Sequence, residues 1–242
     1  MTIRSKKSSD SLSEQVFQNI KNDIFDFKLM PGERFTESEI AQAYQVSRTP
    51  IRQALYRLQQ DGYVEVHFRS GWQVRPLDFK AYEELYDVRI LLEKYAIQQL
   101  CSLDVDVSES SIMTLLREQW YVEPEQYLYD LKALAQLDEA FHCNLVKALG
   151  NMEMAKIHQD ISEKIRIIRR LDFSKDFRIE ATYAEHQRIL ACIFQKDSQA
   201  ACSEIEQHIS KSRDEVKRIT LEMIASHSVC LLYTSDAADE RS

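Results

Sequence analysis

Glycine and proline are scarce in this sequence, which contains four of each in 242 residues. Three of the glycines and three of the prolines lie within the first 78 residues. Because both residue types punctuate turns, the first part of the chain is expected to contain turns and a hairpin. The remainder, with only Pro124 and Gly150, can be nearly all helix.

The sequence also lacks the marks of a membrane or secreted protein. It has no run of about 18 apolar residues, and its polar N-terminus has no signal-peptide core. The five cysteines are odd in number and show no CxxC spacing. This pattern favours reduced thiols and a cytoplasmic location over a disulfide framework.

An excess of positive charge is missing too, since the formal net charge is -8. The charge is unevenly distributed. Residues 1–78 contain 11 Lys+Arg and 10 Asp+Glu, whereas the rest contain 20 and 29. The acidity therefore lies beyond residue 78, and any nucleic-acid contact by the first part depends on where its few cations lie.

A basic, hydroxyl-rich turn opens a short apolar helix at residues 47–55, Ser-Arg-Thr-Pro-Ile-Arg-Gln-Ala-Leu. Upstream, residues 36–44 predict another short helix, in which Thr36 is the N-cap and Glu39 completes a capping box. A tight turn near Gln45 separates the two. Two short helices of which the second begins with basic residues are typical of the helix-turn-helix DNA-binding motif.

The region from residue 12 to 74 resembles the winged-helix head of the GntR family of bacterial transcription regulators. Four words carry the resemblance: Pro-Gly-Glu-Arg-Phe at 31–35, Ser-Arg-Thr-Pro-Ile-Arg at 47–52, Leu-Gln-Gln-Asp-Gly-Tyr-Val at 58–64 and Gly-Trp-Gln-Val at 71–74. Around them the sequence predicts a helix at 12–27 and two short strands, 63–66 and 72–74, joined by a wing.

The resemblance implies DNA contacts for Arg34, Arg48, Thr49, Arg52 and Gly71. Arg48 and Arg52 share one helix face, so that one can read a guanine edge while the other holds a phosphate. Gly71, expected at the wing tip, would let the backbone approach the minor groove. The alternative is that these are ordinary surface residues of a small helical domain.

Four further residues have more open roles. Ser47 can cap its helix or contact a phosphate, and His67 and Arg69 in the wing can also reach DNA. Arg57 is equally well explained as an exposed helix charge.

Beyond a linker at 76–78, residues 79–103 predict a long helix with an apolar stripe of Leu85, Val88, Leu92, Tyr95 and Ala96. Further helices are expected near 107–120, 125–149, 151–171, 177–195 and 198–226. The fold class is therefore mainly α: a winged helix-turn-helix over 1–78, followed by an all-helical bundle over 79–227. The last dozen residues, 231–242, do not continue the amphipathic pattern, and residues 228–242 are interpreted as a non-native tail.

One carboxylate and three histidines stand out in the helical part. Asp138 and His142 are four residues apart on one expected helix, while His186 and His208 lie on two later ones. Apolar residues flank all four. Such a set is typical of sites for divalent zinc or nickel, although a lone histidine is more often an ordinary core or surface residue.

Residues 79–227 resemble the FCD effector domain of the FadR-like branch of GntR regulators. The matching words are Tyr-Asp-Val-Arg at 86–89 with Leu-Glu at 92–93, Asp-Glu-Ala-Phe-His at 138–142, Glu-His at 185–186 with Ile189, and Asp197 through His208. The resemblance implies a homodimer and a metal ion held by Asp138, His142, His186 and His208.

The same resemblance places Arg89 in the effector-facing word, where it can bind an effector carboxylate in bidentate fashion. The alternative is a helix ion pair between Arg89 and Glu93. One of Arg166, Arg169 and Arg170 on a neighbouring helix can also face the site. His158 and His227 match no family word and are interpreted as ordinary histidines.

These observations predict a transcription regulator, a repressor by family habit, that is not an enzyme. A small organic acid bound at the metal would control its affinity for double-stranded operator DNA. Three alternatives remain: a metallohydrolase with Glu185 as general acid or base, a DNA-binding dimer with a purely structural metal, and a metal-free site for an acyl ligand.

Overall fold

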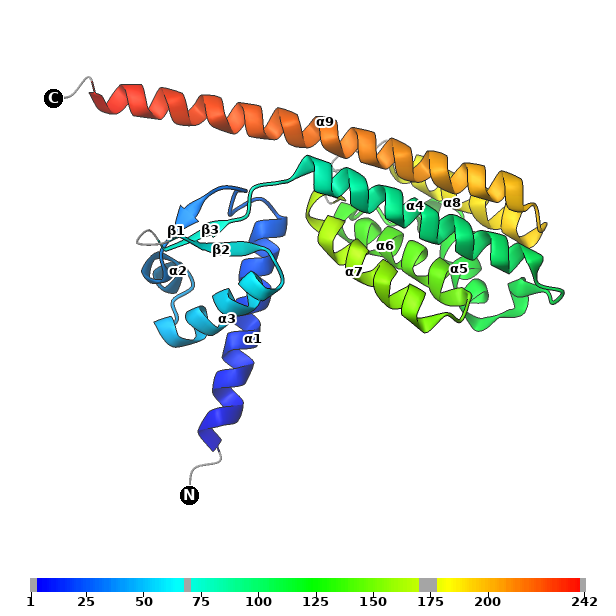
Figure 1. Cartoon of the computed structure of the whole chain (residues 1–242), viewed down its shortest axis with the longest axis horizontal. Coiled ribbons are helices and arrows are strands. Elements are labelled where there is room, and N and C mark those ends of the chain that lie inside the picture. The colour runs from blue at the N-terminus through cyan, green and yellow to red at the C-terminus, as the bar shows by residue number, and fades with distance from the viewer. Residues whose placement is uncertain (1–3, 68–70, 170–177, 240–242) are drawn as a thin grey trace. The chain divides into compact units, whose positions relative to one another are not determined.

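A computed structural model describes residues 4–67, 71–169 and 178–239, with side chains for 12–67, 71–169 and 179–218. Arg69 and Arg170 lie outside the described residues, as does the side chain of His227. The chain divides into two compact units, Met1–Asp78 and Phe79–Ser242. The predicted class, mainly α with an N-terminal winged helix-turn-helix, is confirmed (Figure 1).

The first unit combines three helices with a small sheet. Its elements are α1 (Arg4–Phe25), β1 (Arg34–Phe35), α2 (Glu37–Ala43), α3 (Arg48–Gln60), β2 (Val64–His67) and β3 (Gly71–Val74). The strands are antiparallel in the order β1-β3-β2. The predicted hairpin is thus present, and β1 is an addition, because two residues are too few to show an alternating pattern.

Local chemistry explains where α2 and α3 begin. The Thr36 hydroxyl accepts a hydrogen bond from the Glu39 amide at 3.2 Å, while the Glu39 carboxylate accepts one from the Thr36 amide at 2.7 Å. The predicted capping box is therefore confirmed. Gln45 turns the chain between the helices with a φ of 55°. This turn lets the buried Ile51 and Leu55 of α3 pack into the core of the unit.

The second unit consists of helices. They are α4 (Phe79–Ser102), the 3-10 helix η1 (Val107–Glu109), α5 (Ser111–Trp120), the 3-10 helix η2 (Pro124–Gln126), α6 (Leu131–Ala148), α7 (Met152–Arg169), α8 (Arg178–Phe194) and α9 (Ser198–Asp239). Two helices are shorter than predicted because side chains cap them internally. Ser110 caps α5, and Asp130 accepts a hydrogen bond from the Ala133 amide at the start of α6.

The predicted apolar stripe of α4 was partly wrong. Val88 and Tyr95 are 42% and 49% exposed, whereas the polar Arg89 and Glu93 are buried on the face that packs against the other helices. A hydrophobic pattern assigns the apolar side to the core. It fails here because α4 contributes buried charges to the interior.

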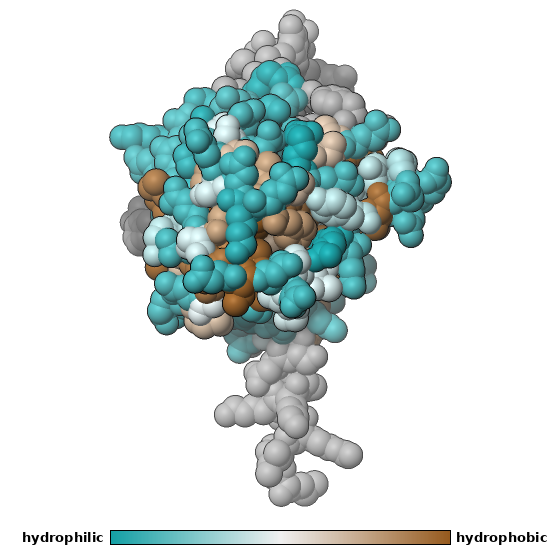
Figure 2. Space-filling model, turned by 90° about the vertical axis from the view of Figure 1, so that its right-hand side faces the viewer, coloured by the Kyte–Doolittle hydropathy of each residue, from teal (hydrophilic) through white to brown (hydrophobic). Residues whose placement is uncertain are grey.

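The last helix is longer than predicted, since α9 continues beyond residue 226 to Asp239. The backbone of 228–239 is therefore helical, and its interpretation as a non-native tail stays a prediction. None of the described helices is both long and apolar enough to cross a membrane. Figure 2 shows a largely hydrophilic face interrupted by apolar side chains.

Candidate metal centre and DNA-binding face

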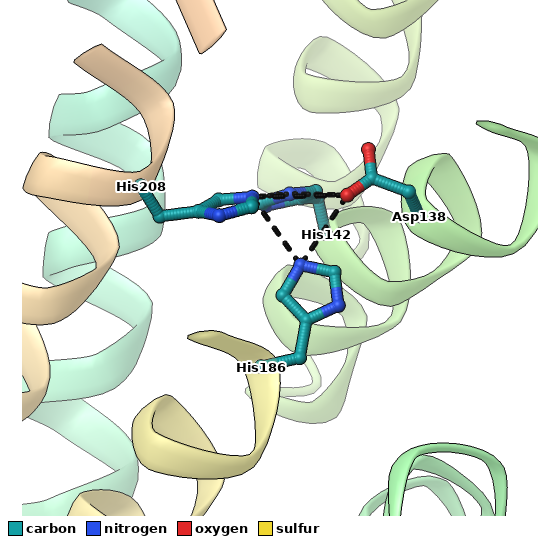
Figure 3. Close-up of side chains that lie close together, drawn as sticks. All are labelled: Asp138, His142, His186 and His208. Carbon is teal, nitrogen blue, oxygen red and sulfur yellow. Dashed lines mark hydrogen bonds and ion pairs between the residues drawn. The ribbon is translucent and has the colours of Figure 1, made fainter. Parts of the chain in front are cut away.

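Asp138 and His142 of α6 meet His186 of α8 and His208 of α9 inside the helical unit (Figure 3). All four are buried, and their ligand atoms lie within 4.8 Å of one another. The Nε2 atom of His208 is 3.2 Å from that of His142 and 3.3 Å from that of His186. Asp138 Oδ1 completes the group at 3.3 Å from His186 Nε2.

These distances fit a shared cation. Zinc binds imidazole nitrogen at about 2.0–2.1 Å, so two ligands of one tetrahedral ion lie about 3.3 Å apart. The separations from Asp138 Oδ1 to His142 and His208 Nε2 are longer, at 3.7 Å each, and the whole group lies within 4.8 Å. The donor set of three imidazoles and one carboxylate also suits zinc or nickel. The residues present therefore fit a divalent metal.

Two carboxylates outside this group orient the imidazoles. Glu93 Oε2 lies 2.7 Å from His142 Nδ1, and Glu185 Oε2 lies 2.7 Å from His208 Nδ1. Because a carboxylate only accepts, each Nδ1 must donate, which leaves the lone pair of the neutral ring on Nε2. When both rings are neutral, the two Nε2 lone pairs point toward each other, the arrangement that a shared metal ion requires.

The buried charges around the cluster set its protonation. Burial alone would raise the pKa of Asp138, but the Arg169 guanidinium and the histidine hydrogen bonds hold it well below the usual range. Burial lowers the pKa of His186 to about 3. Burial also opposes a charge on His208, yet hydrogen bonds with Asp138 and Glu185 raise its pKa. The cluster thus offers an ionised carboxylate and, at His186, a neutral imidazole.

Arg169 is the arginine of α7 that faces the site, since its Nη2 donates to Asp138 Oδ2. Arg166 binds Glu139 instead, at 2.6 Å. Glu185, considered above as a general acid or base, is held by His208 and lies 3.3 Å from Lys211 Nζ. The Glu185 carboxylate therefore orients the His208 imidazole.

Glu93 connects several buried side chains, a role that the sequence did not predict. Besides His142, it accepts hydrogen bonds from Arg89 Nε at 2.8 Å and His158 Nε2 at 2.9 Å, and all of these side chains are buried. Burial would raise the pKa of Glu93, but its interactions with His142, Arg89 and His158 hold this pKa well below its usual value. His158 is thus more than an ordinary core histidine, and its position among apolar residues of α7 was the available signal.

Two buried guanidinium nitrogens have no hydrogen-bond partner within the described residues. They are Nη2 of Arg89, which is bonded to Glu93, and Nη1 of Arg169, which is bonded to Asp138. The ion pair between Arg89 and Glu93 that was considered as an alternative is present. It uses Nε and leaves Nη2 available. Because buried donors are almost always satisfied, these groups point to a polar guest or to bound water.

The predicted DNA-contact residues are on the surface of the first unit. Arg34, Ser47, Arg48, Thr49 and Arg52 are all exposed. Ser47 is the N-cap residue of α3 but makes no side-chain capping bond, so its hydroxyl is available. Arg57 pairs with Glu14 of α1 at 2.5 Å, and His67 lies 3.5 Å from Glu65.

Gly71 begins β3 opposite His67 and has a φ of +88°. A Cβ atom there would lie 2.6 Å from the Phe35 carbonyl oxygen of β1. Glycine is therefore required by the close packing of two strands, a reason independent of DNA. Its predicted approach to the minor groove stays a prediction, because residues 68–70 of the wing lie outside the described part.

Comparisons with known proteins agree with both units. Residues 12–74 match the family model "Bacterial regulatory proteins, gntR family", and residues 84–211 match the FCD domain. The HTH-type transcriptional regulator YdhC of Bacillus subtilis is 28% identical over 208 residues, which cover 85% of this chain and 91% of that protein. The HTH-type transcriptional repressor RspR of Escherichia coli is 20% identical over 224 residues, covering 92% and 96%.

Solved structures show the same fold. A GntR-type transcriptional regulator from Rhodococcus superimposes with a TM-score of 0.64 at 19% identity, covering 85% of this chain and 97% of the other. The chain belongs to the GntR family of bacterial regulatory proteins, with an FCD domain as its second unit. These are families of DNA-binding transcriptional regulators and not of enzymes, so the hydrolase alternative is set aside.

Proposed function

We propose that this regulator is a homodimeric cytoplasmic repressor whose affinity for operator DNA is controlled by a small organic acid bound beside a divalent metal. The convergence of three Nε2 atoms and Asp138 Oδ1 in one buried site carries the proposal. Asp138, His142, His186 and His208 would hold the ion, with zinc or nickel as the best-matched metals. Bound there, the cation would supply Lewis acidity toward a carboxylate oxygen.

The chain's own residues supply the rest of the effector site. Arg89 is held through its Nε by Glu93, so that its free Nη2 can donate to an effector carboxylate. Arg169 Nη1 is a second buried donor of the same kind. A carboxylate that satisfies both would remove two unpaired buried donors, each of which costs about 1–3 kcal/mol.

Homodimer formation is supported by an exposed apolar stripe on α4. Val88, Leu91 and Tyr95 lie one helical turn apart and are 42%, 68% and 49% exposed. Apolar side chains gathered on one exposed helix face are typical of an interaction surface. The repressor role draws its support from RspR, a relative described as a repressor.

The first test is the metal content of the tag-free protein, compared with a His186→Ala, His208→Ala double variant. About one divalent ion per chain is expected for the wild type and none for the variant. A His67→Ala variant, which removes an exposed histidine of the first unit, serves as the matched control and should keep its metal. Wild-type protein that stays metal-free after reloading would overturn the metal site.

The effector is tested with the metal-loaded protein and a panel of small carboxylates. We expect one of them to raise the melting temperature and to release an operator selected from a random duplex library. Arg89→Lys should weaken both effects, while Arg166→Lys, on α7, should not.

The four ligands can also fill a tetrahedral shell by themselves, which favours the second candidate function, a dimeric DNA-binding protein with a structural metal. Under that function the metal would bind as above, but no carboxylate would change either the melting temperature or operator binding.

A further inference from the structure

Two arginines of the recognition helix α3, Arg48 and Arg52, are held in different ways by the helix before it. Arg52 Nε lies 3.0 and 3.2 Å from the two carboxylate oxygens of Glu37, and Arg52 Nη2 lies 2.8 Å from Glu37 Oε2. Arg48 makes a single hydrogen bond, from Nη2 to the Ser38 hydroxyl at 2.6 Å. Glu37 and Ser38 are neighbours at the start of α2.

The bonds to Glu37 leave one edge of Arg52 available. A guanidinium has five N–H groups, and Glu37 occupies the side formed by Nε and Nη2. The opposite edge, formed by Nη1 and the second Nη2 proton, carries no hydrogen bond within the described residues. Two parallel N–H groups of this kind match the O6 and N7 acceptors of guanine.

Glu37 is itself well placed to hold Arg52 still. Its side chain is only 17% exposed, whereas that of Arg52 is 57% exposed. The hydrogen bond from Arg52, the charges of Arg52 and Arg48, and a smaller contribution from the Trp72 side chain of β3 outweigh burial and lower the pKa of Glu37. Glu37 therefore fixes the exposed Arg52 side chain against the rest of the unit. Because the guanidinium plane is already held in place, the Arg52 side chain loses less conformational entropy when it binds a base.

A carboxylate at this position also has a cost. Negative charge on a DNA-facing surface repels phosphates and lowers affinity for every sequence alike. Glu37 is thus unfavourable for general DNA binding, so a contribution that it makes to DNA recognition lies in selecting one sequence over another. Arg48, with one bond to a neutral hydroxyl, keeps the freedom to follow a phosphate.

We propose that Arg52 is the base-reading arginine, that it recognises a guanine in each half of the operator, and that Glu37 is the positioning residue that sets this specificity. Arg48 then contacts the phosphate backbone. The inference rests on the DNA-binding head and, for the two half-sites, on the proposed homodimer, and it is independent of the metal and the effector.

The test uses the full-length protein and a random-sequence DNA duplex library, followed by affinity measurements on the selected duplex and on single-base variants of it. Arg52→Ala should abolish the preference for one guanine per half-site, which is worth roughly tenfold or more in affinity. Arg48→Ala should weaken binding to all sequences and reduce the salt dependence, while the base preference stays.

Glu37→Gln provides the decisive readout. We expect a several-fold smaller preference for that guanine, together with unchanged or tighter binding to unrelated DNA. A folding defect cannot produce this combination, because it would weaken binding to all DNA. In an Arg52→Ala background, Glu37→Gln should cause no further loss of preference.

Arg57→Ala is the matched control, since it removes another exposed arginine of α3 that pairs with a glutamate, Glu14. It should leave the selected sequence unchanged. The proposal is overturned if Glu37→Gln leaves the guanine preference intact, or if Arg48→Ala removes it and Arg52→Ala does not.

Discussion

Among the single residues of the helical unit, buried charges form a connected series around the histidine cluster. Glu93 joins Arg89, His142 and His158, and Asp138 joins the histidine cluster to Arg169. Each buried charge has an opposite partner, as burial in a low-dielectric interior demands. The candidate site is therefore a network in which Glu93 is an outer partner of the candidate ligand His142.

Glu93→Gln tests this network at the residue scale. The amide keeps the size of the side chain but loses the charge, so His142 is oriented less firmly and Arg89 loses its counterion. Metal affinity should fall about 10–100-fold, as for other outer partners of metal ligands. The measurement is a competition titration with a metal indicator. Glu139→Gln, which removes the partner of Arg166, should not change metal affinity, and an equal effect of the two would contradict the prediction.

At the scale of elements, the approach of β1 to β3 depends on one glycine. Gly71→Ala would place a Cβ atom 2.6 Å from the Phe35 carbonyl oxygen in addition to the strain of a positive φ. Thermal unfolding should show a loss of more than about 1–3 kcal/mol, the cost of backbone strain alone. Gly62→Ala has a similar φ of +82° but meets only a side chain at 3.6 Å, so it should cost less. Equal losses would mean that the strands separate easily.

The elements themselves were largely predictable from sequence, because their signals are local. Thr36 and Glu39 are three residues apart, and the capping box they predict is present. The strand β1 and the split of residues 107–120 into η1 and α5 were not predicted. Strand β1 exists only through pairing with β3, a contact between residues far apart in sequence.

At the scale of the whole molecule, the exposed stripe on α4 predicts assembly. Leu91→Lys should convert a species of twice the 28.4 kDa chain mass into a monomer, because a buried lysine without a partner destabilises an interface. Light scattering after size exclusion would measure this. Val105→Lys, at a matched exposure of 64% outside the stripe, should leave the mass unchanged. A wild-type monomer would contradict the prediction.

Metal removal provides a second test at this scale. The four ligands come from α6, α8 and α9, so an ion binding only the folded chain should stabilise the helical unit as a whole. At 100 times its dissociation constant the stabilisation is about 2.7 kcal/mol, or roughly 5–10 °C in melting temperature. Calorimetry with a chelator, and then with metal added back, should show this loss and its recovery. The His186→Ala, His208→Ala variant should show neither.

The sequence by itself determined the family, the order of helices, and the residue types that could hold a metal. These follow from short-range spacing, such as the spacing of four from Asp138 to His142, and from motifs that occur as continuous words. The tertiary structure decided which face of α4 is buried, which arginine of α7 meets Asp138, and that Glu93 and His158 belong to the site. Buried charges are stabilised by partners on other helices, and only packing of the whole unit establishes those pairs.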